Sequence, residues 1–411
     1  MDKSFLTEFK QREYYNQCTD FDALNEIMRA KPIRAYIGFD CTAKSLHVGS
    51  LLQIMCLRML QKHGHQPIVL LGGGTTRIGD PSGKEETRKM LSDKEIETNI
   101  KNIQKVFNIF LKTSNSKIKP IFVNNFKWLG KLNYIKFLRE IGKHFTINKM
   151  LNFDSVKLRL DREQSLSYME FNYMILQAYD FLELNKNKNC IMQIGGSDQW
   201  GNIVNGVELI KRYSGKQSFG LTTPLITLAS GAKMGKTESG AVWLDKSLLS
   251  PYDYWQFWRN TDDRDVIKFL KMFTDLSLKK IEDIKNKNIN KLKILLANEA
   301  TTMLHGKTSA EKAEQTAKKT FGSGSFGDDL PTIKIGKKEL ENGLNIIDLV
   351  IASNLLASKS EVRRIIKNKG IKINNQTIED QNLEISLKNF NNHNFLKLSL
   401  GKKKHVIIKI N

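Results

Sequence analysis

The chain has 411 residues, of which 40% are hydrophobic, so it is long enough for two or three domains with separate cores. Its formal net charge of +22 favours a polyanionic partner such as nucleic acid. The four cysteines show no Cys-x-x-Cys spacing, which argues against a structural zinc site or a disulfide framework. Because no apolar run could span a bilayer and no signal peptide is recognisable, we expect a cytoplasmic protein.

Residues 34–63 predict an inner strand that turns directly into a helix with one apolar face. Thr42 and Ser45 are candidate caps for that helix. A helix N-terminus after a strand is a ready anion site, and His47 would add a donor to phosphate oxygens. Gly49 would let a flat ring lie close to the backbone. Taken alone, this short motif also fits a capped helix with a chance histidine.

A second strand and a loop rich in glycine follow. Residues 66–72 are apolar throughout, as in a strand buried on both faces of a parallel sheet. Glycines crowd the loop 72–88 at the carboxyl end of this strand, where open α/β sheets bind their ligands. An ordinary flexible surface loop of the same composition remains the alternative.

The helix predicted at 168–182 carries Tyr173, Gln177 and Asp180 on one face, because they are spaced at i, i+4 and i+7. A hydroxyl, an amide and a carboxylate in line suit the recognition of a polar amino acid. A solvated polar stripe is the alternative, and the apolar residues around these three argue against it.

A further strand at 190–194 leads into a Gly-Gly turn at 195–202, where Asp198 would accept hydrogen bonds from ribose hydroxyls. The helix predicted next, at 203–213, ends in two basic residues, which are favourable at a helix C-terminus. Strands alternating with helices predict an α/β fold with a Rossmann-like parallel sheet.

The second half of the chain changes character. Residues 247–320 are helical and rich in lysine, and a Gly/Ser break near 322–327 indicates a linker. Residues 345–411 hold 12 Lys and Arg against five Asp and Glu. A basic helix at 358–370 and a hairpin that turns at 374–375 predict a small α+β module suited to an RNA backbone. A merely solvated basic face is the alternative.

Two short motifs, His47-Val-Gly-Ser50 and Lys233-Met-Gly-Lys-Thr237, together resemble the signatures His-Ile-Gly-His and Lys-Met-Ser-Lys-Ser of class I aminoacyl-tRNA synthetases. The run Gly-Gly-Ser-Asp-Gln-Trp-Gly-Asn at 195–202 narrows the resemblance to the bacterial tyrosyl-tRNA synthetases, and it extends over nearly the whole chain. Three departures stand out: Ser50 replaces the second histidine, Cys41 stands where proline is usual, and Ile37 stands where many relatives carry a cysteine that contacts the ribose.

The resemblance implies that the chain is a tyrosine–tRNA ligase. Such an enzyme activates L-tyrosine with ATP to tyrosyl-adenylate plus pyrophosphate, then transfers tyrosyl to the 3′ end of tRNA(Tyr). Mg²⁺ is expected to arrive with ATP, held mainly by phosphates and water, and no structural metal is expected. The alternatives are a tryptophanyl-tRNA synthetase and a catalytically inactive, synthetase-like RNA-binding protein.

The resemblance also implies domains and a homodimer. Residues 1–245 would form the Rossmann-type catalytic domain, with a dimer-interface insertion at about 127–165. Residues 246–322 would form an α-helical anticodon-arm domain and residues 323–344 a linker. Residues 345–411 would form an RNA-binding domain of the kind found in a ribosomal protein.

Site residues follow from the matching positions. The residues expected to act in catalysis are His47, Lys233, Lys236, Thr237, Lys84, Arg88 and Thr42. Those expected to bind tyrosine are Tyr36, Asp80, Tyr173, Gln177, Asp180, Gln193 and Gln199. Those expected to bind the nucleotide are Gly38, Asp40, Gly49, Ser50, Gly196 and Asp198. Those expected to bind tRNA are Lys211, Arg212, Arg363, Arg364 and Lys367.

Overall fold

The computed structural model describes residues 4–80, 90–112, 118–229, 231, 234–237, 240–322, 331–341, 343–390, 395–401 and 404–410. For a few of them, including Lys236 and Thr237, the description covers the backbone and not the side chain. The chain divides into two compact units, Met1–Ala310 and Glu311–Asn411. Among the described residues, no helix combines the length and the apolar character that a bilayer crossing requires.

The helices of the first unit are α1 (Phe5–Gln11), α2 (Phe21–Ala30), α3 (Leu51–Lys62), α4 (Asp93–Phe110), α5 (Phe126–Leu129), α6 (Tyr134–Glu140), α7 (Ile147–Leu151), α8 (Asp154–Asp161), α9 (Tyr168–Phe171), α10 (Tyr173–Lys188), α11 (Trp200–Ser214), α12 (Pro251–Arg259), α13 (Val266–Phe273), α14 (Leu278–Ile284) and α15 (Ile289–His305). Its strands are β1 (Gln17–Cys18), β2 (Arg34–Phe39), β3 (Gln66–Leu71), β4 (Ile121–Asn124), β5 (Cys190–Gly196), β6 (Phe219–Thr223), β7 (Lys236–Thr237) and β8 (Gly240–Ala241).

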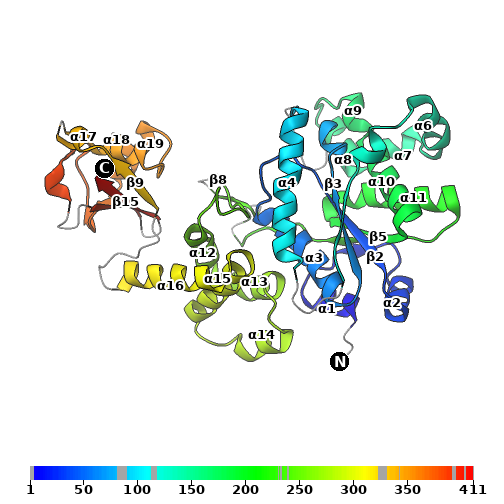
Figure 1. Ribbon diagram of the computed structural model, residues 1–411, viewed down its shortest axis with the longest axis horizontal. Helices are drawn as coiled ribbons and strands as arrows, with labels where there is room; N and C mark the ends of the chain where they lie inside the picture. Colours follow the sequence, from blue (N-terminus) through cyan, green and yellow to red (C-terminus); the bar gives the residue numbers. More distant parts are fainter. Residues whose placement is uncertain are drawn as a thin grey trace. The chain divides into compact units, whose positions relative to one another are not determined.

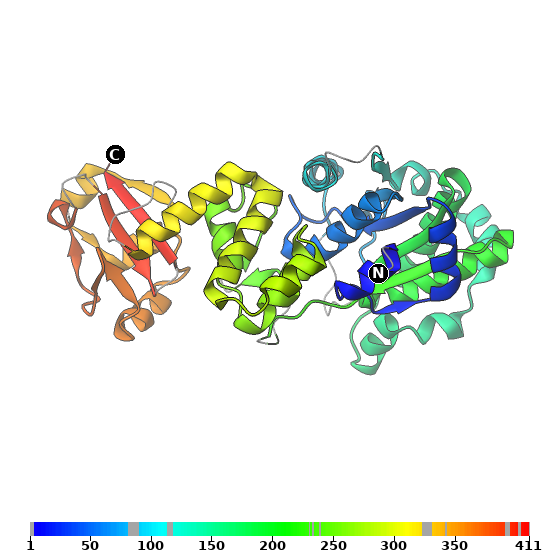
Figure 2. The same ribbon diagram turned by 90° about the horizontal axis from the view of Figure 1, so that it is seen from below.

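The core of the first unit is a six-stranded sheet in the order β1-β6-β5-β2-β3-β4. The five strands from β6 to β4 pair in parallel, and β1 is antiparallel to β6. Helices α3 and α4 lie on one side of this sheet and α10 and α11 on the other (Figures 1 and 2). The parallel sheet expected from the alternation of strands and helices is therefore confirmed.

The segment between β4 and α10 consists of the short helices α5 to α9. Several of its large apolar side chains are exposed: Phe126, Tyr134, Ile135, Leu138, Ile147, Leu151, Leu160 and Tyr168. Their neighbours Met150 and Val156 are buried in the core beside α10 and α11. The segment thus has one face in the core and a second apolar face on the surface.

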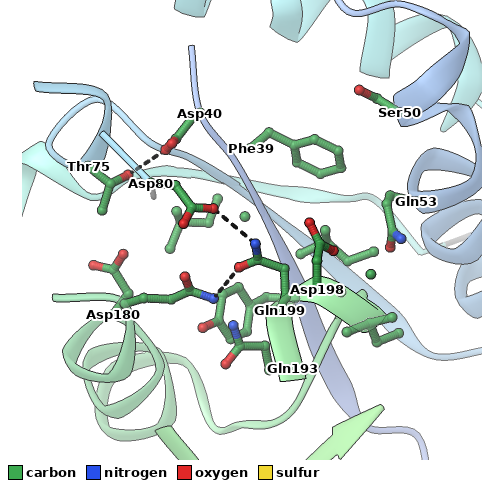
Figure 3. A pocket seen from close by; sticks show the side chains of 18 of the residues that line it. Phe39, Asp40, Ser50, Gln53, Thr75, Asp80, Asp180, Gln193, Asp198 and Gln199 are labelled. Atoms are coloured by element: carbon green, nitrogen blue, oxygen red, sulfur yellow. Dashed lines mark hydrogen bonds between the residues drawn. The ribbon is translucent and has the colours of Figure 1, made fainter. Parts of the chain in front are cut away.

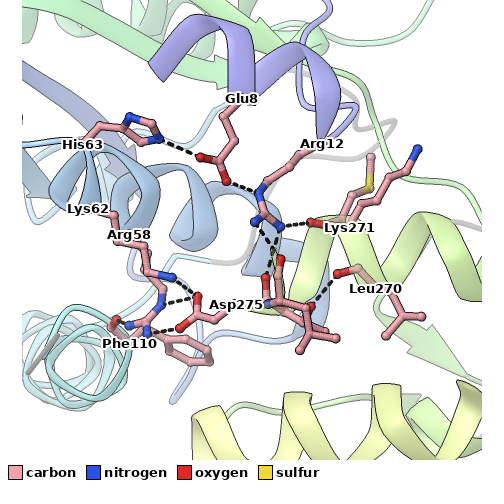
Figure 4. A network of polar contacts seen from close by, with 12 residues as sticks. Glu8, Arg12, Arg58, Lys62, His63, Phe110, Leu270, Lys271 and Asp275 are labelled. Carbon is pink, nitrogen blue, oxygen red and sulfur yellow. Dashed lines mark hydrogen bonds and ion pairs between the residues drawn. The ribbon is translucent and has the colours of Figure 1, made fainter. Parts of the chain in front are cut away.

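The helices α12 to α15 belong to the same compact unit as the sheet, because a polar network ties them to α1 and α3 (Figure 4). The Arg12 guanidinium donates to the carbonyl oxygens of Lys271, Thr274 and Leu276 at 2.7, 3.3 and 2.9 Å. Asp275 forms ion pairs with Arg58 and Lys62 at the end of α3. The boundary expected at residue 245 is therefore not a division between separate compact units.

The second unit has the strands β9 (Thr332–Ile335), β10 (Leu344–Asn345), β11 (Ile371–Ile373), β12 (Gln376–Thr377), β13 (Glu384–Ile385), β14 (Phe395–Leu400) and β15 (Lys404–Ile410). Its helices are α17 (Lys337–Glu341), α18 (Ile346–Ala352) and α19 (Lys359–Lys367), and α16 (Lys307–Gly322) crosses the division between the units.

Strand β9 corrects the expected linker at 323–344. It pairs in parallel with β15 and completes the sheet β12-β11-β14-β15-β9, with Ile335 and Leu340 in the core beneath it. Residues 332–341 therefore belong to the C-terminal module, because their alternating apolar side chains are buried against it. The predicted hairpin turn is present: Asn374 and Asn375 join β11 to β12 with φ of 47° and 71°.

The ion pairs of Asp275 should stabilise the first unit. Burial opposes ionisation of Asp275, but Arg58 and Lys62 outweigh it and lower its pKa to about 2. Because the pKa is lower in the folded chain than its value of 3.8 in the unfolded chain, the ionised carboxylate stabilises the fold at pH values above 3.8. This stabilisation is lost as the pH falls through about 2. We expect Asp275→Asn to destabilise the unit at pH 7 by roughly 1–2 kcal/mol, allowing for solvent screening of a partly exposed group.

Calorimetry between pH 7 and pH 2 measures this effect, and the difference from wild type should shrink below pH 4. Asp283 on α14 is an exposed carboxylate, and Asp283→Asn is the matched control, with a change of less than about 0.5 kcal/mol. Equal stability of the two variants at pH 7 would contradict the stabilising role of the network.

Candidate active site

A cavity of about 330 Å³ lies at the carboxyl ends of β2, β3 and β5. Helix α10 and the turn before α3 complete its wall (Figure 3). The cavity brings together all thirteen residues that the sequence assigned to tyrosine or nucleotide binding. The remaining residues of its wall are Ile37, Phe39, Leu46, Gln53, Leu70, Thr75, Ile194, Gly195 and Leu225.

At one end of the cavity, Tyr36 of β2 and Asp180 of α10 are 1% and 2% exposed. The Tyr36 hydroxyl has no hydrogen-bond partner in the part of the chain that the structure describes. The Asp180 carboxylate accepts from Trp128 Nε1 at 2.6 Å and from Asn125 Nδ2 at 2.8 Å. An oriented carboxylate next to an unpartnered buried hydroxyl is suited to a ligand that both donates and accepts a hydrogen bond.

Burial shifts the pKa values of both groups at this end of the cavity, Asp180 and Tyr36. It raises the pKa of Asp180 to about 7, although the hydrogen bonds from Asn125 and Trp128 act in the opposite direction. Burial also raises the pKa of Tyr36 well above its usual value, and the nearby charge of Asp180 adds to that rise. Tyr36 is therefore a neutral donor at pH 7, while Asp180 titrates close to neutrality.

A chain of hydrogen bonds connects Asp180 to the middle of the cavity. Asn125 Nδ2 donates to Asp180 and, at 3.1 Å, to Thr75 Oγ1, whose hydroxyl donates to Asp40 Oδ1 at 2.9 Å. The Tyr173 hydroxyl approaches the Asp40 carboxylate oxygens at 3.3 and 3.4 Å. The two carboxylates are thereby oriented by one continuous polar chain.

A second polar chain crosses the floor of the cavity. Gln199 Nε2 donates to Asp80 at 2.9 Å, and Gln177 Nε2 donates to Gln199 Oε1 at 3.3 Å (Figure 3). Asn202, at the start of α11, donates to both Gln177 and Gln199, at 3.0 and 3.3 Å. The chain places one carboxylate and two amides where an ammonium group could be held.

The two signature motifs meet at the other end of the cavity. His47 Nδ1 accepts from the Gly49 N–H at 3.0 Å, so a neutral ring carries its proton on Nε2. Backbone bonds from Val48 N to Val242 O and from Leu244 N to Leu46 O, at 2.9 and 2.8 Å, join this turn to the segment directly after β8. The predicted helix begins as a 3₁₀ turn at Val48–Ser50 followed by α3, which is later than a cap at Thr42 or Ser45 would place it.

The close contact between the motifs depends on two glycines. A Cβ at Gly49 would lie 2.6 Å from the His47 ring and 3.0 Å from the Met234 carbonyl oxygen. Gly235 has φ of +109°, and a Cβ there would lie 2.8 Å from the Gly49 nitrogen. Side chains at either position would separate the two motifs.

Some predicted residues lie elsewhere. Thr42 is exposed and is not part of the cavity wall, and Ser45 donates to the Leu46 carbonyl oxygen. Neither caps the helix, because the helical turn begins only at Val48, and the side chain of His47 caps it.

Lys236 and Thr237 form β7, which pairs with β8, and their side chains are outside the described residues. Lys84, Arg88 and Lys233 lie outside the described residues altogether.

The basic residues assigned to tRNA are on surfaces of both units. Lys211 and Arg212 end α11, where Arg212 pairs with Glu208 at 3.3 Å and donates to the His144 carbonyl oxygen. The second unit presents three exposed residues on α19: Arg363, Arg364 and Lys367.

Sequence reasoning missed the residues that orient the site, namely Thr75, Gln53, Asn125, Trp128 and Asn202. Asn125 follows directly after β4, so a polar residue at the carboxyl end of a strand was the available signal. Trp128 offered no such signal, because its contact with Asp180 links residues that are 52 positions apart in the chain.

Comparison with known proteins agrees with this geometry. Residues 28–322 match the family model described as tRNA synthetases class I (W and Y). Residues 323–408 match the Tyrosine–tRNA ligase SYY-like C-terminal domain. A Tyrosine–tRNA ligase of Pelagibacter ubique is 68% identical over 406 residues, which cover 99% of both chains. The chain belongs to the tyrosine–tRNA ligase family of class I tRNA synthetases.

The family resemblance drawn from the two signature motifs is thereby confirmed, and solved structures agree with it. A C-terminally truncated mitochondrial tyrosyl-tRNA synthetase of Aspergillus nidulans has a TM-score of 0.70 at 30% identity, covering 78% of this chain and 95% of that one. A tryptophanyl-tRNA synthetase of Encephalitozoon cuniculi, bound to tryptophan, has a TM-score of 0.55 at 12% identity, covering 74% and 87%. The second likeness shows the fold alone.

Because the pKa of Asp180 is raised, the free energy of unfolding should depend on pH. The pKa of Asp180 is about 7 in the folded chain and 3.8 in the unfolded chain, so the folded chain binds the proton more tightly. The stability of the fold therefore falls as the pH rises from about 4 to 7. We therefore expect Asp180→Asn, measured without ligand, to gain stability relative to wild type by up to about 1.4 kcal/mol per pH unit in this window.

Thermal unfolding of both proteins from pH 4 to pH 8 measures the difference. A difference that does not change with pH would show that Asp180 titrates near its ordinary value.

Proposed function

We propose that this chain joins tyrosine to tRNA, and that tyrosine and ATP react in the cavity at the ends of β2, β3 and β5. The observation that carries the proposal is the pair of buried groups at one end, Tyr36 and Asp180. A phenol between them accepts from Tyr36, whose hydroxyl lacks a partner among the described residues, and donates to Asp180. Phenylalanine can do neither, and the indole of tryptophan offers a donor only.

The α-ammonium of tyrosine would lie across the floor of the cavity. Asp80 supplies the charge, and Gln177 and Tyr173 supply oxygen acceptors on the same helical face that holds Asp180. Gln199 links Asp80 to Gln177, so these acceptors form one oriented set. The carboxylate of tyrosine then points toward the end of the cavity where Gly49, Ser50 and Asp198 lie.

In the first step, an oxygen of that carboxylate attacks the α-phosphorus of ATP, and pyrophosphate leaves with the electron pair of the broken P–O bond. The carboxylate is already ionised at pH 7, so no general base is required. The protein positions the reactants and stabilises the charge that moves to the pyrophosphate. His47 Nε2, the backbone of the Gly49–Ser50 turn and the ammonium groups of Lys233 and Lys236 are the proposed donors.

ATP would bring Mg²⁺ with it, since Mg²⁺ retains several waters and binds phosphate oxygens. Asp40 and Asp198 on the cavity wall suit this ion, because a carboxylate can accept hydrogen bonds from its coordinated waters.

In the second step, a ribose hydroxyl at the tRNA 3′ end attacks the tyrosyl carbonyl, and AMP leaves. The basic ends of α11 and α19 support binding of the tRNA backbone in each unit. We propose that residues 1–245 act in catalysis, that residues 246–322 contact the anticodon arm, and that the module from about residue 331 binds RNA. The free cysteines suit a cytoplasmic location.

The proposal for the tyrosine subsite predicts the effect of Asp180→Ala. This change removes an acceptor for the phenol, so the preference for tyrosine over phenylalanine in kcat/KM should fall by roughly 10- to 100-fold. ATP–pyrophosphate exchange with tyrosine, phenylalanine and tryptophan measures this preference, and circular dichroism verifies the fold. If the wild type catalyses exchange with tryptophan instead of tyrosine, the chain is a tryptophanyl-tRNA synthetase. If it catalyses no exchange with any of the three amino acids, the result favours an inactive RNA-binding protein.

Asp198→Asn is the matched control, because Asp198 is a carboxylate on the nucleotide side of the same cavity. It should lower exchange with both amino acids and leave their ratio near that of wild type. A folded Asp180→Ala variant with unchanged discrimination would mean that the phenol is recognised elsewhere.

We also propose that two copies of this chain form a homodimer through the exposed apolar face of the α5–α9 segment. Tyr134 and Tyr168 on this face share a hydrogen bond of 2.9 Å between their hydroxyls and are 57% and 67% exposed. Ile135 and Ile147 are 64% and 60% exposed. An exposed apolar patch of this kind marks an interaction surface.

Ile135→Lys should convert the dimer to a monomer at micromolar concentration, because it would bury a charge in the interface. Sedimentation velocity gives the mass. The control is Ile109→Lys, because this isoleucine is 44% exposed but belongs to α4 and not to the α5–α9 segment. The proposal is wrong if both variants have the same mass as wild type.

A further inference from the structure

Three side chains from other elements hold the two residues directly after β2, Asp40 and Cys41. Thr76 Oγ1 accepts from the Cys41 N–H at 2.7 Å, and Asn99 Nδ2 of α4 donates to the Cys41 carbonyl oxygen at 2.9 Å. Thr75 Oγ1 donates to the Asp40 carboxylate at 2.9 Å. Consecutive threonines of the turn after β3 therefore bind consecutive residues of the turn after β2.

These bonds occur where the sheet no longer supplies partners. The bond from Gly72 N to Phe39 O, at 2.9 Å, is the last one between the backbones of β2 and β3. Cys41 is completely buried, so a Cys41 N–H without a partner would carry the full cost of desolvation. The Thr76 hydroxyl satisfies this donor and so fixes the direction in which the chain leaves the strand.

The direction of the chain at this point affects the nucleotide side of the cavity. Asp40 lines the cavity and lies within 3.4 Å of the Tyr173 hydroxyl. Six residues after Cys41, the same chain segment reaches His47, which caps the turn with Gly49 and Ser50. A shift at Cys41 therefore moves Asp40 and the start of that turn together.

We propose that Thr76 is a positioning residue for ATP, acting through the Cys41 N–H on Asp40 and the His47 turn. The inference rests on the proposed function of the cavity and adds a residue that does not line it. Proline, which is usual at this position in the family that the sequence resembles, has a fixed φ and no N–H. A proline at 41 would need no acceptor at 76, so Cys41 and Thr76 form an interdependent pair.

The interdependence makes a specific test possible in the full-length chain. Thr76→Val keeps the side-chain shape and removes the acceptor, so the KM for ATP in tyrosine-dependent pyrophosphate exchange should rise by about three- to tenfold. The KM for tyrosine should change less. Thr76→Ser keeps the hydroxyl and should remain close to wild type in both constants.

The double variant Cys41→Pro/Thr76→Val removes the unpaired donor and should recover most of the affinity for ATP. Two controls complete the set. Thr98→Val removes a threonine hydroxyl that bonds the Lys94 carbonyl oxygen on the exposed face of α4, and it should match wild type. Cys41→Ala tests the thiol, which contacts the Phe39 carbonyl oxygen at 3.6 Å, and should have a smaller effect than Thr76→Val.

Two results would overturn the inference. The first is a Thr76→Val variant whose KM for ATP equals that of wild type. The second is a folded double variant whose KM for ATP is as high as that of Thr76→Val. If the double variant does not fold, the test is the comparison of Thr76→Ser with Thr76→Val. Equal KM values for ATP in these two variants would exclude a role for the hydroxyl. Absence of tyrosine-dependent exchange in the wild type would instead contradict the proposed function itself.

Discussion

The burial of the Asp180 carboxylate is the constraint on which the site depends. A carboxylate placed between α10 and a parallel sheet loses its hydration, and its pKa of about 7 reflects that loss. Asn125 and Trp128 reduce the cost by donating to its two oxygens. Because Asn125 also donates to Thr75, and Thr75 donates to Asp40, the same bonds that satisfy Asp180 orient the next carboxylate along the cavity.

The opposite end of the cavity depends on backbone contacts. The turn that contains His47 is bonded to residues 242–244, and Gly49 and Gly235 allow the two motifs to touch. This contact brings together backbone donors, a histidine and the loop that carries two lysines. A site of this composition suits the stabilisation of a leaving pyrophosphate, which is the role proposed for it.

The helices α12 to α15 continue the first unit: Arg12 binds carbonyl oxygens at the end of α13 and just after it, and the Asp275 side chain pairs with Arg58 and Lys62 of α3. Helix α3 begins at the nucleotide side of the cavity, next to Ser50, and ends with Lys62 at this network. One rigid helix therefore connects the end of the cavity to the helical segment proposed to contact tRNA. The C-terminal module is a separate unit with its own apolar core.

The sequence by itself determined the family and the parallel sheet, and the positions that match the family named thirteen residues of the cavity wall. Apolar runs of strand length identify β2, β3 and β5, and polar residues at their carboxyl ends must meet at one edge of a parallel sheet. The spacing of Tyr173, Gln177 and Asp180 likewise follows from helical geometry alone. The signature residues predict the chemistry at that edge.

Tertiary structure alone decided which side chains orient the site and where the units divide. The contacts of Asp180 with Asn125 and Trp128, and of Cys41 with Thr76, join positions 35 to 55 residues apart, and no local pattern encodes such distances. Strand β9 was read as linker because four residues carry too weak a signal until β15 pairs with them. The helix after β2 begins later than expected because His47, extended in the backbone, replaces Thr42 and Ser45 as the cap.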